Sequence, residues 1–247
     1  MRIALLADVH ANREALAACL DHARHHGVGH YVFLGDLVGY GADPEWVLDT
    51  AIDLAREGAR VVLGNHDAAV LRGAERTMRD DAQAAVAWMR ARIAPAHLEF
   101  LAGLPLSLAS ADSLYVHANA WKPGGWEYIA TSVDARRSLD ATDCRFTFCG
   151  HLHVPALYHQ GTMGRVAHFA PVAGVEIPLG SHHRWLAVLG AVGQPRDGNP
   201  AASYAIHDLE QRHLTFHRVP YDVESAARKI TEAGLPAWLA ARLETGV

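Results

Sequence analysis

Cysteine, basic charge and long apolar runs are all scarce in this chain of 247 residues. Its three cysteines, Cys19, Cys144 and Cys149, show neither CxxC spacing nor the spacing of a Cys/His finger. The sequence therefore signals no disulfide framework and no structural zinc site. The formal net charge is −5, without the basic excess that neutralises a nucleic-acid backbone or an anionic membrane surface. We expect neither a nucleic-acid polymer nor a membrane among its partners.

No apolar run approaches the roughly 18 residues of a membrane-spanning helix. The first apolar run, residues 3–7, meets Asp8 before the core of a signal peptide could form. We therefore expect a soluble, cytoplasmic protein. Half of the residues are hydrophobic, so a chain of this length can bury a full core, and no linker divides it. We expect a single domain over residues 1–247, while the oligomeric state is not defined by the pattern.

The first two-thirds of the chain alternate short β-rich runs with helical patterns, which is typical of an α/β fold. Strands are predicted at residues 3–7, 31–34, 61–63, 113–116 and 145–149, and helices at residues 13–26, 44–57, 80–93 and after Pro95. The remainder has turn residues and no helix between its predicted strands, at residues 166–169, 185–192, 203–208 and 214–219. This favours antiparallel pairing in a second sheet. A helical tail at residues 223–243 is interrupted around Gly234 and Pro236.

Five polar clusters each follow a strand-like apolar run. In chain order they are Asp8-Val9-His10, Gly35-Asp36, Gly64-Asn65-His66-Asp67, His117 and Gly150-His151-Leu152-His153. The loops after the carboxyl ends of parallel strands share one edge of a sheet, so we expect these clusters to converge. A lone His or Asp at a strand end is more often a hydrogen-bonded loop residue than a ligand, but five such clusters in succession argue against coincidence.

The clusters offer carboxylate, amide and imidazole donors and no thiolate. This donor set suits a divalent ion such as Mn, Fe, Zn, Ni or Co, whereas an all-oxygen cage would favour calcium or magnesium. Seven ligand side chains exceed the needs of one four- to six-coordinate ion. We therefore expect two metal ions at one site.

The order DxH, GD, GNHD, H and GHxH resembles the calcineurin-like metallophosphoesterases. Residues 8–12 (DVHAN) and 35–41 (GDLVGYG) look like the small prokaryotic phosphodiesterase-type branch of that superfamily. The resemblance implies an α/β fold, namely a four-layer α/β/β/α sandwich of two mixed β-sheets flanked by helices, with the strands after His153 forming the second sheet. It also implies that the substrate is a small phosphoester.

Carried over residue by residue, the resemblance assigns one metal ion to Asp8, His10, Asp36 and His153. It assigns the other ion to Asp36, Asn65, His117 and His151, so that Asp36 bridges the two, and manganese is favoured. A hydroxide bridging the ions would attack phosphorus in line, with His66 as the general acid that protonates the leaving group. Asn65 and His66 would also contact the substrate.

The chain departs from two related groups of enzymes. Protein serine/threonine phosphatases and symmetric dinucleoside tetraphosphatases carry GDxVDRG and an arginine before GNH, where this chain has Gly39-Tyr40-Gly41 and Leu63. Without those two phosphate-binding arginines, a monoanionic diester is favoured over a dianionic monoester. A phosphodiesterase acting on small or nucleotide-like substrates is therefore predicted, and a phosphomonoesterase or phosphoprotein phosphatase is the alternative.

A non-catalytic scaffold of the same fold is disfavoured because His66 is present. The acid that orients the histidine of GNH in the related enzymes is missing here. Asp43 and Asp67 are the candidate substitutes.

Three further residues are candidate substrate contacts. Arg196 follows a predicted strand and could bind phosphate, or it could be an ordinary turn arginine. Trp121 and Trp126 follow His117 and could stack on a base or an aryl leaving group, or they could anchor their loop. Four more histidines, at positions 22, 25, 26 and 30, are interpreted as an exposed surface cluster, since no acidic residues accompany them.

Overall fold

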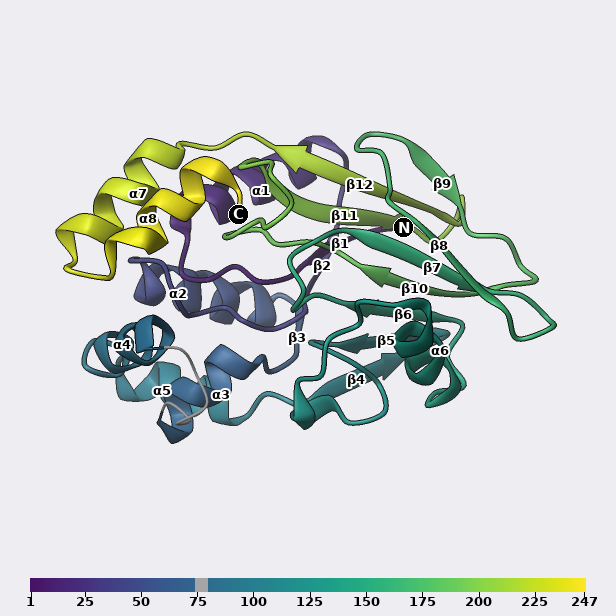
Figure 1. Cartoon of the computed structure of the whole chain (residues 1–247), viewed down its shortest axis with the longest axis horizontal. Coiled ribbons are helices and arrows are strands. Elements are labelled where there is room, and N and C mark those ends of the chain that lie inside the picture. The colour runs from purple at the N-terminus through teal and green to yellow at the C-terminus, as the bar shows by residue number, and fades with distance from the viewer. Residues whose placement is uncertain (74–79) are drawn as a thin grey trace.

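Two six-stranded sheets lie face to face, with helices on their outer sides (Figure 1). The structure is a computed structural model that describes residues 1–73 and 80–247, apart from the side chain of Asp81. The first sheet has the order β3-β2-β1-β11-β12-β9, and the second has the order β4-β5-β6-β10-β7-β8. Both sheets mix parallel and antiparallel pairs. The four-layer α/β/β/α sandwich is therefore confirmed.

The strands of the first sheet are β1 (Arg2–Leu6), β2 (His30–Phe33), β3 (Arg60–Val61), β9 (Glu176–Pro178), β11 (Ala202–Asp208) and β12 (His213–Val219). Those of the second sheet are β4 (Ser107–Ser110), β5 (Ser113–Val116), β6 (Phe146–Cys149), β7 (Ala156–Gln160), β8 (Val166–Phe169) and β10 (Arg184–Val188). The helices are α1 (Arg13–His25), α2 (Pro44–Arg56), α3 (Asn65–Arg72), α4 (Asp80–Arg90), α5 (Pro95–Ala102), α6 (Ser132–Asp140), α7 (Val223–Glu232) and α8 (Ala237–Thr245).

The alternation of side chains along β1 shows how the layers are held together. Ile3 and Leu5 point into the apolar cluster between the two sheets, whereas Ala4 and Leu6 point into the cluster formed with α1 and α2. This is the two-residue period of a strand that is buried on both faces. On the far side of the second sheet, a third cluster joins β5 and β6 to Leu139 of α6.

Parallel strands bring the polar clusters to common edges, as the sequence predicted. Strands β1, β2 and β3 are mutually parallel in the first sheet, and β5, β6 and β10 are parallel in the second. Each polar cluster follows the carboxyl end of one of these strands. Backbone hydrogen bonds then tie the loops together, such as Asp8 N to Gly35 O at 3.2 Å and Gly150 N to His117 O at 2.9 Å.

The expected membership of the second sheet was wrong in part, because β8 and β10 belong to it but β11 and β12 do not. Strands β11 and β12 extend the first sheet, where β11 pairs antiparallel with β1. The second sheet is built around β5 and β6 from the first two-thirds of the chain, and β10 pairs parallel to β6 as well as antiparallel to β7. The apolar pattern predicts where a strand lies but not which strands it pairs with. Strand β11 is buried along almost its whole length, and a central strand of either sheet would show the same pattern.

Several short elements were not predicted. These are β4, β7, β9, α3 and α6. Helix α6 begins with a capping box in which Thr131 and Asp134 exchange hydrogen bonds, and the residue pattern of this box is present in the sequence. The break in the helical tail is confirmed, since α7 ends at Glu232 and α8 begins at Ala237.

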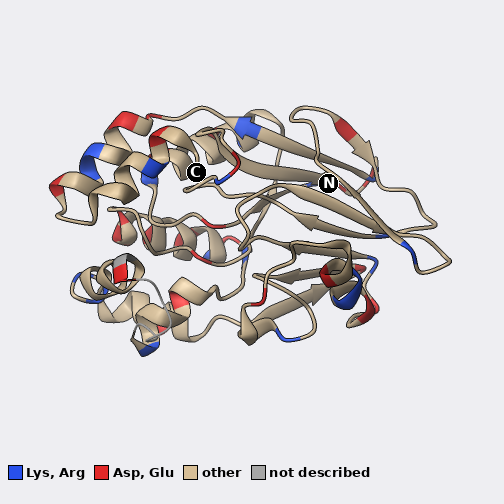
Figure 2. Ribbon diagram, in the orientation of Figure 1, with Lys and Arg blue, Asp and Glu red and all other residues tan. Residues whose placement is uncertain are grey.

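Charged side chains of both signs lie mainly on the helices and loops, and the strands carry few (Figure 2). Within residues 1–73 and 80–247, no helix is both long and apolar enough to span a bilayer. The three cysteines are free thiols.

Candidate metal centre

The loops that carry the predicted ligands have an unusual backbone conformation. Five of these ligands have positive φ: Asp8 (55°), His10 (50°), Asp36 (52°), His151 (67°) and His153 (64°). Non-glycine residues pay an energetic cost in this region, typically about 1–3 kcal/mol in sparsely populated conformations, and such residues gather at functional sites. The observed strain therefore marks these loops as a candidate functional site.

The first group of side chains comprises Asp8, His10 and His153, all buried. The Nε2 atoms of the two histidines are 3.1 Å apart, and Asp8 Oδ1 lies 3.2 Å from His153 Nε2. The other carboxylate oxygen of Asp8 accepts a hydrogen bond from His151 N at 2.9 Å. Asp8 Oδ1 itself is buried without a hydrogen-bond partner among the described residues.

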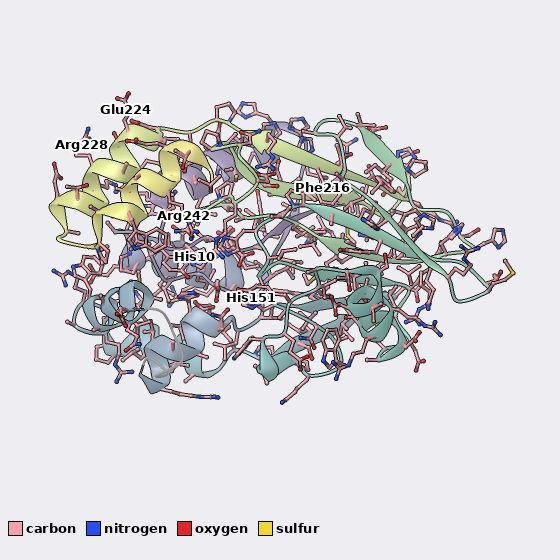
Figure 3. All side chains as sticks on the ribbon, in the orientation of Figure 1. His10, His151, Phe216, Glu224, Arg228 and Arg242 are labelled. Atoms are coloured by element: carbon pink, nitrogen blue, oxygen red, sulfur yellow. The ribbon has the colours of Figure 1, made fainter. Side chains whose placement is uncertain are left out.

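The second group comprises Asp36, His117 and His151, also buried. His117 Nε2 lies 3.0 Å from His151 Nδ1, 3.0 Å from Asn65 Oδ1 and 3.4 Å from Asp36 Oδ2. Asn65 is half-buried at the start of α3. The structure thus brings all seven predicted ligands together in the division expected from the sequence, and Figure 3 shows His10 and His151 near each other at the centre of the molecule.

Asp36 lies between the two groups. Its Oδ2 is 3.8 Å from His10 Nε2 on one side and 3.4 Å from His117 Nε2 on the other. Its Oδ1 accepts a hydrogen bond from His66 N at 2.8 Å, which fixes the orientation of the carboxylate. This is the position that a bridging ligand requires.

The outer nitrogens of all four imidazoles are held by backbone carbonyls. His10 Nδ1 binds Val38 O at 3.1 Å, His117 Nδ1 binds Leu34 O at 2.7 Å, and His153 Nδ1 binds Gln194 O at 2.6 Å. His151 Nε2 binds Trp126 O at 2.9 Å. A carbonyl accepts but cannot donate, so each of these nitrogens carries the proton of the neutral ring.

When all four rings are neutral, as they are when they bind a metal ion, their inner nitrogens therefore point lone pairs at each other and at carboxylate oxygens. Such an arrangement is repulsive without a cation, whereas it is the usual arrangement of histidines that bind a metal ion and donate their other N–H to a carbonyl. The buried Asp8 oxygen without a partner supports the same conclusion. The residues therefore fit two divalent ions chemically.

The pKa values of these groups reflect burial and the nearby carboxylates. Burial lowers the pKa of His10 well below its ordinary value, and burial together with the neighbouring His117 lowers the pKa of His151 to about 3. Burial also disfavours the charged form of His117, but the Asp36 carboxylate outweighs it and raises the His117 pKa to about 9. Without metal, one proton on His117 thus partly compensates the negative charge.

His66 lies beside Asp36 on α3, and its ring is buried. The ring centroid is 4.4 Å from that of Tyr40 and 5.1 Å from that of His10. Its Nδ1 has no hydrogen-bond partner among the described residues. Burial lowers the pKa of His66, with Asp36 opposing the shift.

Neither candidate acid orients His66. Asp67 accepts hydrogen bonds from Val38 N and Gly64 N, at 3.1 and 3.0 Å. Asp43 forms an ion pair with Lys229 at 2.8 Å. Both carboxylates instead stabilise the fold, because Asp67 accepts hydrogen bonds from backbone amides and Asp43 pairs with a lysine.

Arg196 lies close to the two groups. Its guanidinium is 5.8 Å from the centre of the Tyr40 ring, and Gln194 Oε1 accepts hydrogen bonds from it at 2.9 and 3.3 Å. Its positive charge acts to lower the pKa values of both His10 and His66.

The two tryptophans differ in position. The ring of Trp126 is 5.8 Å from that of His117, and its carbonyl holds His151. Trp121 instead donates to Glu127 at 3.4 Å, and the Arg137 guanidinium covers its ring at 4.5 Å, which favours the loop-anchoring alternative for this residue.

Two aromatic residues at the site were missed in the sequence. Tyr40 packs against the rings of both His10 and His66, and Tyr128 stacks on His151 at 4.3 Å while remaining 48% exposed. The sequence comparison marks Tyr40 only as the residue that replaces an arginine of related enzymes. Tyr128 carried no signal, because it lies on a loop that approaches His151 only in the folded chain.

The two-sheet sandwich with paired Asp/His groups at its strand ends places this chain among the metallophosphoesterases. Residues 1–212 match the family model described as the calcineurin-like phosphoesterase superfamily domain. The chain belongs to this superfamily, which implies metal-dependent hydrolysis of phosphoesters.

Relatives and solved structures agree with this membership. An uncharacterised protein of Methanocaldococcus jannaschii is 34% identical over 99% of this chain and 98% of its own length. The crystal structure of a metallophosphoesterase from Sphaerobacter thermophilus is 37% identical, with a TM-score of 0.88 and full coverage of both chains. A hypothetical protein of Pyrococcus horikoshii shares the fold at 18% identity, with a TM-score of 0.81 over 100% of this chain and 98% of its own.

Proposed function

We propose that this protein is a dinuclear metal-dependent phosphodiesterase acting on small or nucleotide-like phosphodiesters. The observation that carries the proposal is the pair of adjacent buried Asp/His groups whose inner ring nitrogens lie close to each other and to the carboxylates, with Asp36 between the groups. One ion would be held by Asp8, His10, Asp36 and His153, and the other by Asp36, Asn65, His117 and His151. Manganese is the favoured metal.

Two bound divalent ions would supply the Lewis acidity that activates a water nucleophile and neutralises charge on the phosphate. The chain's own residues fix the geometry of this reaction. Backbone carbonyls orient the four imidazoles, and the His66 amide orients the Asp36 carboxylate. Because these groups are already ordered, little reorganisation is needed when charge develops on the phosphoryl group.

His66 is proposed as the general acid for the leaving group. Its amide binds Asp36, so its ring is held beside the centre without serving as a ligand. In the free protein, burial favours the neutral ring. An anionic phosphate bound beside the ring would favour the imidazolium and so supply the proton that the departing alkoxide requires.

The preference for diesters is argued from fixed charge. Tyr40 and Leu63 stand where related monoesterases carry arginines, so a second negative charge on the substrate would lack a partner. The position of Arg196 favours the alternative, a phosphomonoesterase, because its guanidinium lies close to Tyr40. In a monoesterase this cation would bind the second negative charge of the phosphate, whereas in a diesterase it would not be needed for that charge.

The test compares bis-p-nitrophenyl phosphate with p-nitrophenyl phosphate on the manganese-loaded protein. We expect kcat/KM to be higher for the diester, and chelation to abolish both activities. A tenfold preference for the monoester, about 1.4 kcal/mol in transition-state binding, would overturn the proposed specificity. Activity that survives complete metal removal would overturn the mechanism.

Arg196→Ala then shows whether this cation grips the phosphate. If it does, the variant loses more kcat/KM on the monoester than on the diester. Arg228→Ala is the matched control, since Arg228 lies on α7 at the outer surface and pairs there with Glu232 at 3.8 Å (Figure 3). Equal losses on both substrates would show that Arg196 does not select between them.

A further inference from the structure

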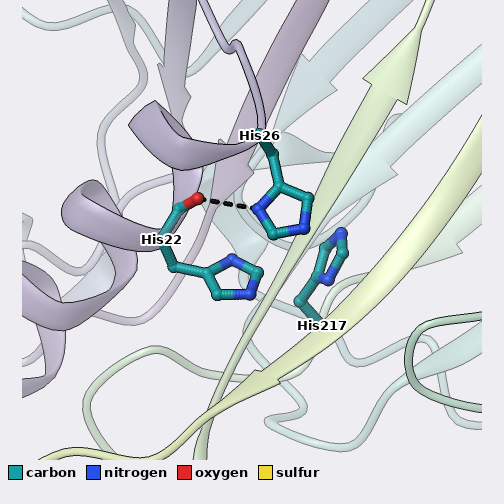
Figure 4. Close-up of side chains that lie close together, drawn as sticks. All are labelled: His22, His26 and His217. Atoms are coloured by element: carbon teal, nitrogen blue, oxygen red, sulfur yellow. Dashed lines mark hydrogen bonds between the residues drawn. The ribbon is translucent and has the colours of Figure 1, made fainter.

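Three histidines meet on the outer side of the first sheet, away from the loops of the proposed metal centre. His22 lies in the last turn of α1, His26 is the C-cap residue that follows this helix, and His217 lies on β12 (Figure 4). One ring nitrogen from each lies within 4.8 Å of one from each of the others. Nothing in the proposed phosphoesterase reaction uses these residues. The sequence predicted one exposed cluster of His22, His25, His26 and His30. In the structure, two of these, His22 and His26, instead group with His217 from a distant strand.

The rings are packed together in a defined arrangement. The centroids of His22 and His26 are 4.2 Å apart, and that of His217 is 4.9 Å from the first and 5.1 Å from the second. Spacing of four residues places His22 and His26 on one face of the helix. Tyr204, directly opposite His217 in the antiparallel pair β11–β12, stacks on the His217 ring at 5.3 Å and so limits its movement.

Hydrogen bonds select the nitrogens that remain available. His22 Nδ1 bonds to the Tyr204 hydroxyl at 2.7 Å, and His26 Nδ1 donates to His22 O at 2.8 Å. The latter contact is drawn in Figure 4. Because a carbonyl can only accept, the neutral His26 ring carries its proton on Nδ1 and leaves a lone pair on Nε2. Ligand histidines are typically oriented by such bonds.

We propose that His22, His26 and His217 form a second metal site, which binds one zinc-like divalent transition-metal ion with solvent in the fourth position. Three imidazoles without carboxylate or thiolate suit Zn, Cu or Ni, and a His₃ set with one open position is a known zinc arrangement. Two ligands of a tetrahedral zinc ion lie roughly 3.4 Å apart, given Zn–N bonds of about 2.0–2.1 Å. The ligand nitrogens lie within 4.8 Å of one another, so side-chain rotation that brings them closer by up to about 1.4 Å completes the site.

The site is open to ions from solution. His26 is exposed, while His22 and His217 are half-buried. A hollow of about 190 Å³ is lined by His26 and His217 among other residues, and it leaves room for solvent ligands. Burial and the neighbouring histidines lower the pKa of His22, and they lower that of His217 to about 4, so both rings are ready to bind a cation at neutral pH.

A bound ion would link the end of α1 to β12. Its ligands His26 and His217 are 191 positions apart in the sequence. This link joins the helical layer to the sheet that carries Asp8 and Asp36, so it stabilises the native arrangement of that layer by mass action. It contributes no ligand to the proposed dinuclear centre.

Zinc stoichiometry tests this site on the full chain. The protein is stripped with a chelator, saturated with zinc, freed of excess ion and analysed for metal content. We expect His26→Gln, His217→Gln and the double variant to bind one zinc ion fewer per chain than the unmodified protein. This difference is independent of how many ions the dinuclear centre holds, so failure of the proposed function and failure of the second site remain distinguishable.

His25→Gln is the matched control. His25 lies on the same helix, but its side chain is 75% exposed and contacts Asp21 rather than the cluster. This variant should keep the full zinc content, and circular dichroism should show unchanged folding for all variants. His26→Gln alters an exposed side chain, so it stays informative even if His217→Gln is destabilised.

Imidazole NMR supplies a second measurement. On zinc addition, the ring resonances of His22, His26 and His217 should shift, while those of His25 and the exposed His182 stay unchanged. Equal zinc content in the unmodified protein and the double variant, or ring resonances of the three histidines that do not respond to zinc, would overturn the proposal.

Discussion

At the scale of single residues, variants of Asp36 and His66 can distinguish a loss of metal binding from a loss of catalysis. Asp36 lies between both ligand groups, whereas His66 contacts Asp36 only through its backbone amide. We expect Asp36→Asn to lose metal from both sites, because it removes charge from the shared ligand. His66→Ala should keep its metal yet lose about 10²–10⁴ in kcat on an alkyl phosphodiester, the usual contribution of general acid catalysis.

The leaving group provides the control for this pair of variants. Nitrophenolate departs without protonation, so the loss in His66→Ala should shrink on bis-p-nitrophenyl phosphate. Metal analysis and steady-state kinetics on both substrates make the comparison. Equal losses on alkyl and nitrophenyl esters would contradict the role of proton donor and point to stabilisation of charge on the phosphoryl group instead.

The proposed ligand residues could be predicted from the sequence because each lies within a few positions of a strand end. Their partners could not. The carbonyls of Leu34, Val38 and Gln194 that hold the imidazoles come from loops paired only in the folded chain. The same holds for Tyr128 against His151 and for Arg196 against Tyr40. A sequence names chemical groups, whereas contacts between loops depend on how the two sheets stack.

At the scale of elements, glycines let adjacent loops approach closely enough to form the centre. A Cβ on Gly64 would lie 2.1 Å from Asp36 Oδ1, and one on Gly150 would lie 2.3 Å from Asp8 Oδ2. Both glycines precede ligand motifs at the ends of β3 and β6. Each motif therefore needs a glycine at this position, because any side chain would clash with the carboxylate of the neighbouring loop.

Gly64→Ala should therefore displace the Asp36 carboxylate. We expect impaired metal binding and a loss of about 1–3 kcal/mol in the free energy of unfolding, as is common for overpacking. Metal content and urea unfolding measure the two effects. Gly29→Ala is the matched control, since a Cβ there meets no atom within 4 Å. A Gly64→Ala variant with full metal content would show that the loop can relax and would contradict this explanation.

The order of strands illustrates what periodicity can and cannot predict. Alternation between helices and strands correctly indicated the parallel arrangement of β1, β2 and β3, because a crossover helix connects each pair. No such constraint acts on the strands after His153. Their turns allow pairing within one sheet or across to the other, and the choice that places β11 beside β1 comes from packing of the whole sandwich.

At the scale of the whole molecule, the core between the sheets joins strands from both ends of the chain, and a buried histidine of β11 lies beside it. His207 of β11 is 1% exposed, and its ring lies 5.2 Å from the rings of both Phe146 and Phe148 of β6. Its Nδ1 has no hydrogen-bond partner in the described part of the chain. Burial lowers its pKa to about 4, and the neighbouring Asp208 only partly opposes the shift.

This histidine makes the sandwich sensitive to acid. Above pH 6.5 or so, the ordinary histidine pKa, the ring is neutral in both the folded and the unfolded chain, so its contribution to stability is fully present. As the pH falls from about 6.5 towards 4, the unfolded chain binds a proton that the folded chain does not, and stability is lost. For a folded pKa of about 4, this loss amounts to about 2 kcal/mol between pH 7 and pH 5.

His207→Leu removes the titrating group while keeping the site apolar. The decrease in the free energy of unfolding between pH 7 and pH 5 should therefore be about 2 kcal/mol smaller in the variant than in the unmodified chain. Urea unfolding of chelator-treated protein at both pH values measures this difference without interference from bound metal. His182→Gln, a change at an exposed histidine, should leave the pH dependence unaltered. If His207→Leu loses as much stability on acidification as the unmodified chain, then the buried ring takes up its proton in the folded state, and the acid sensitivity comes from other histidines whose pKa burial lowers, such as His217 and His151.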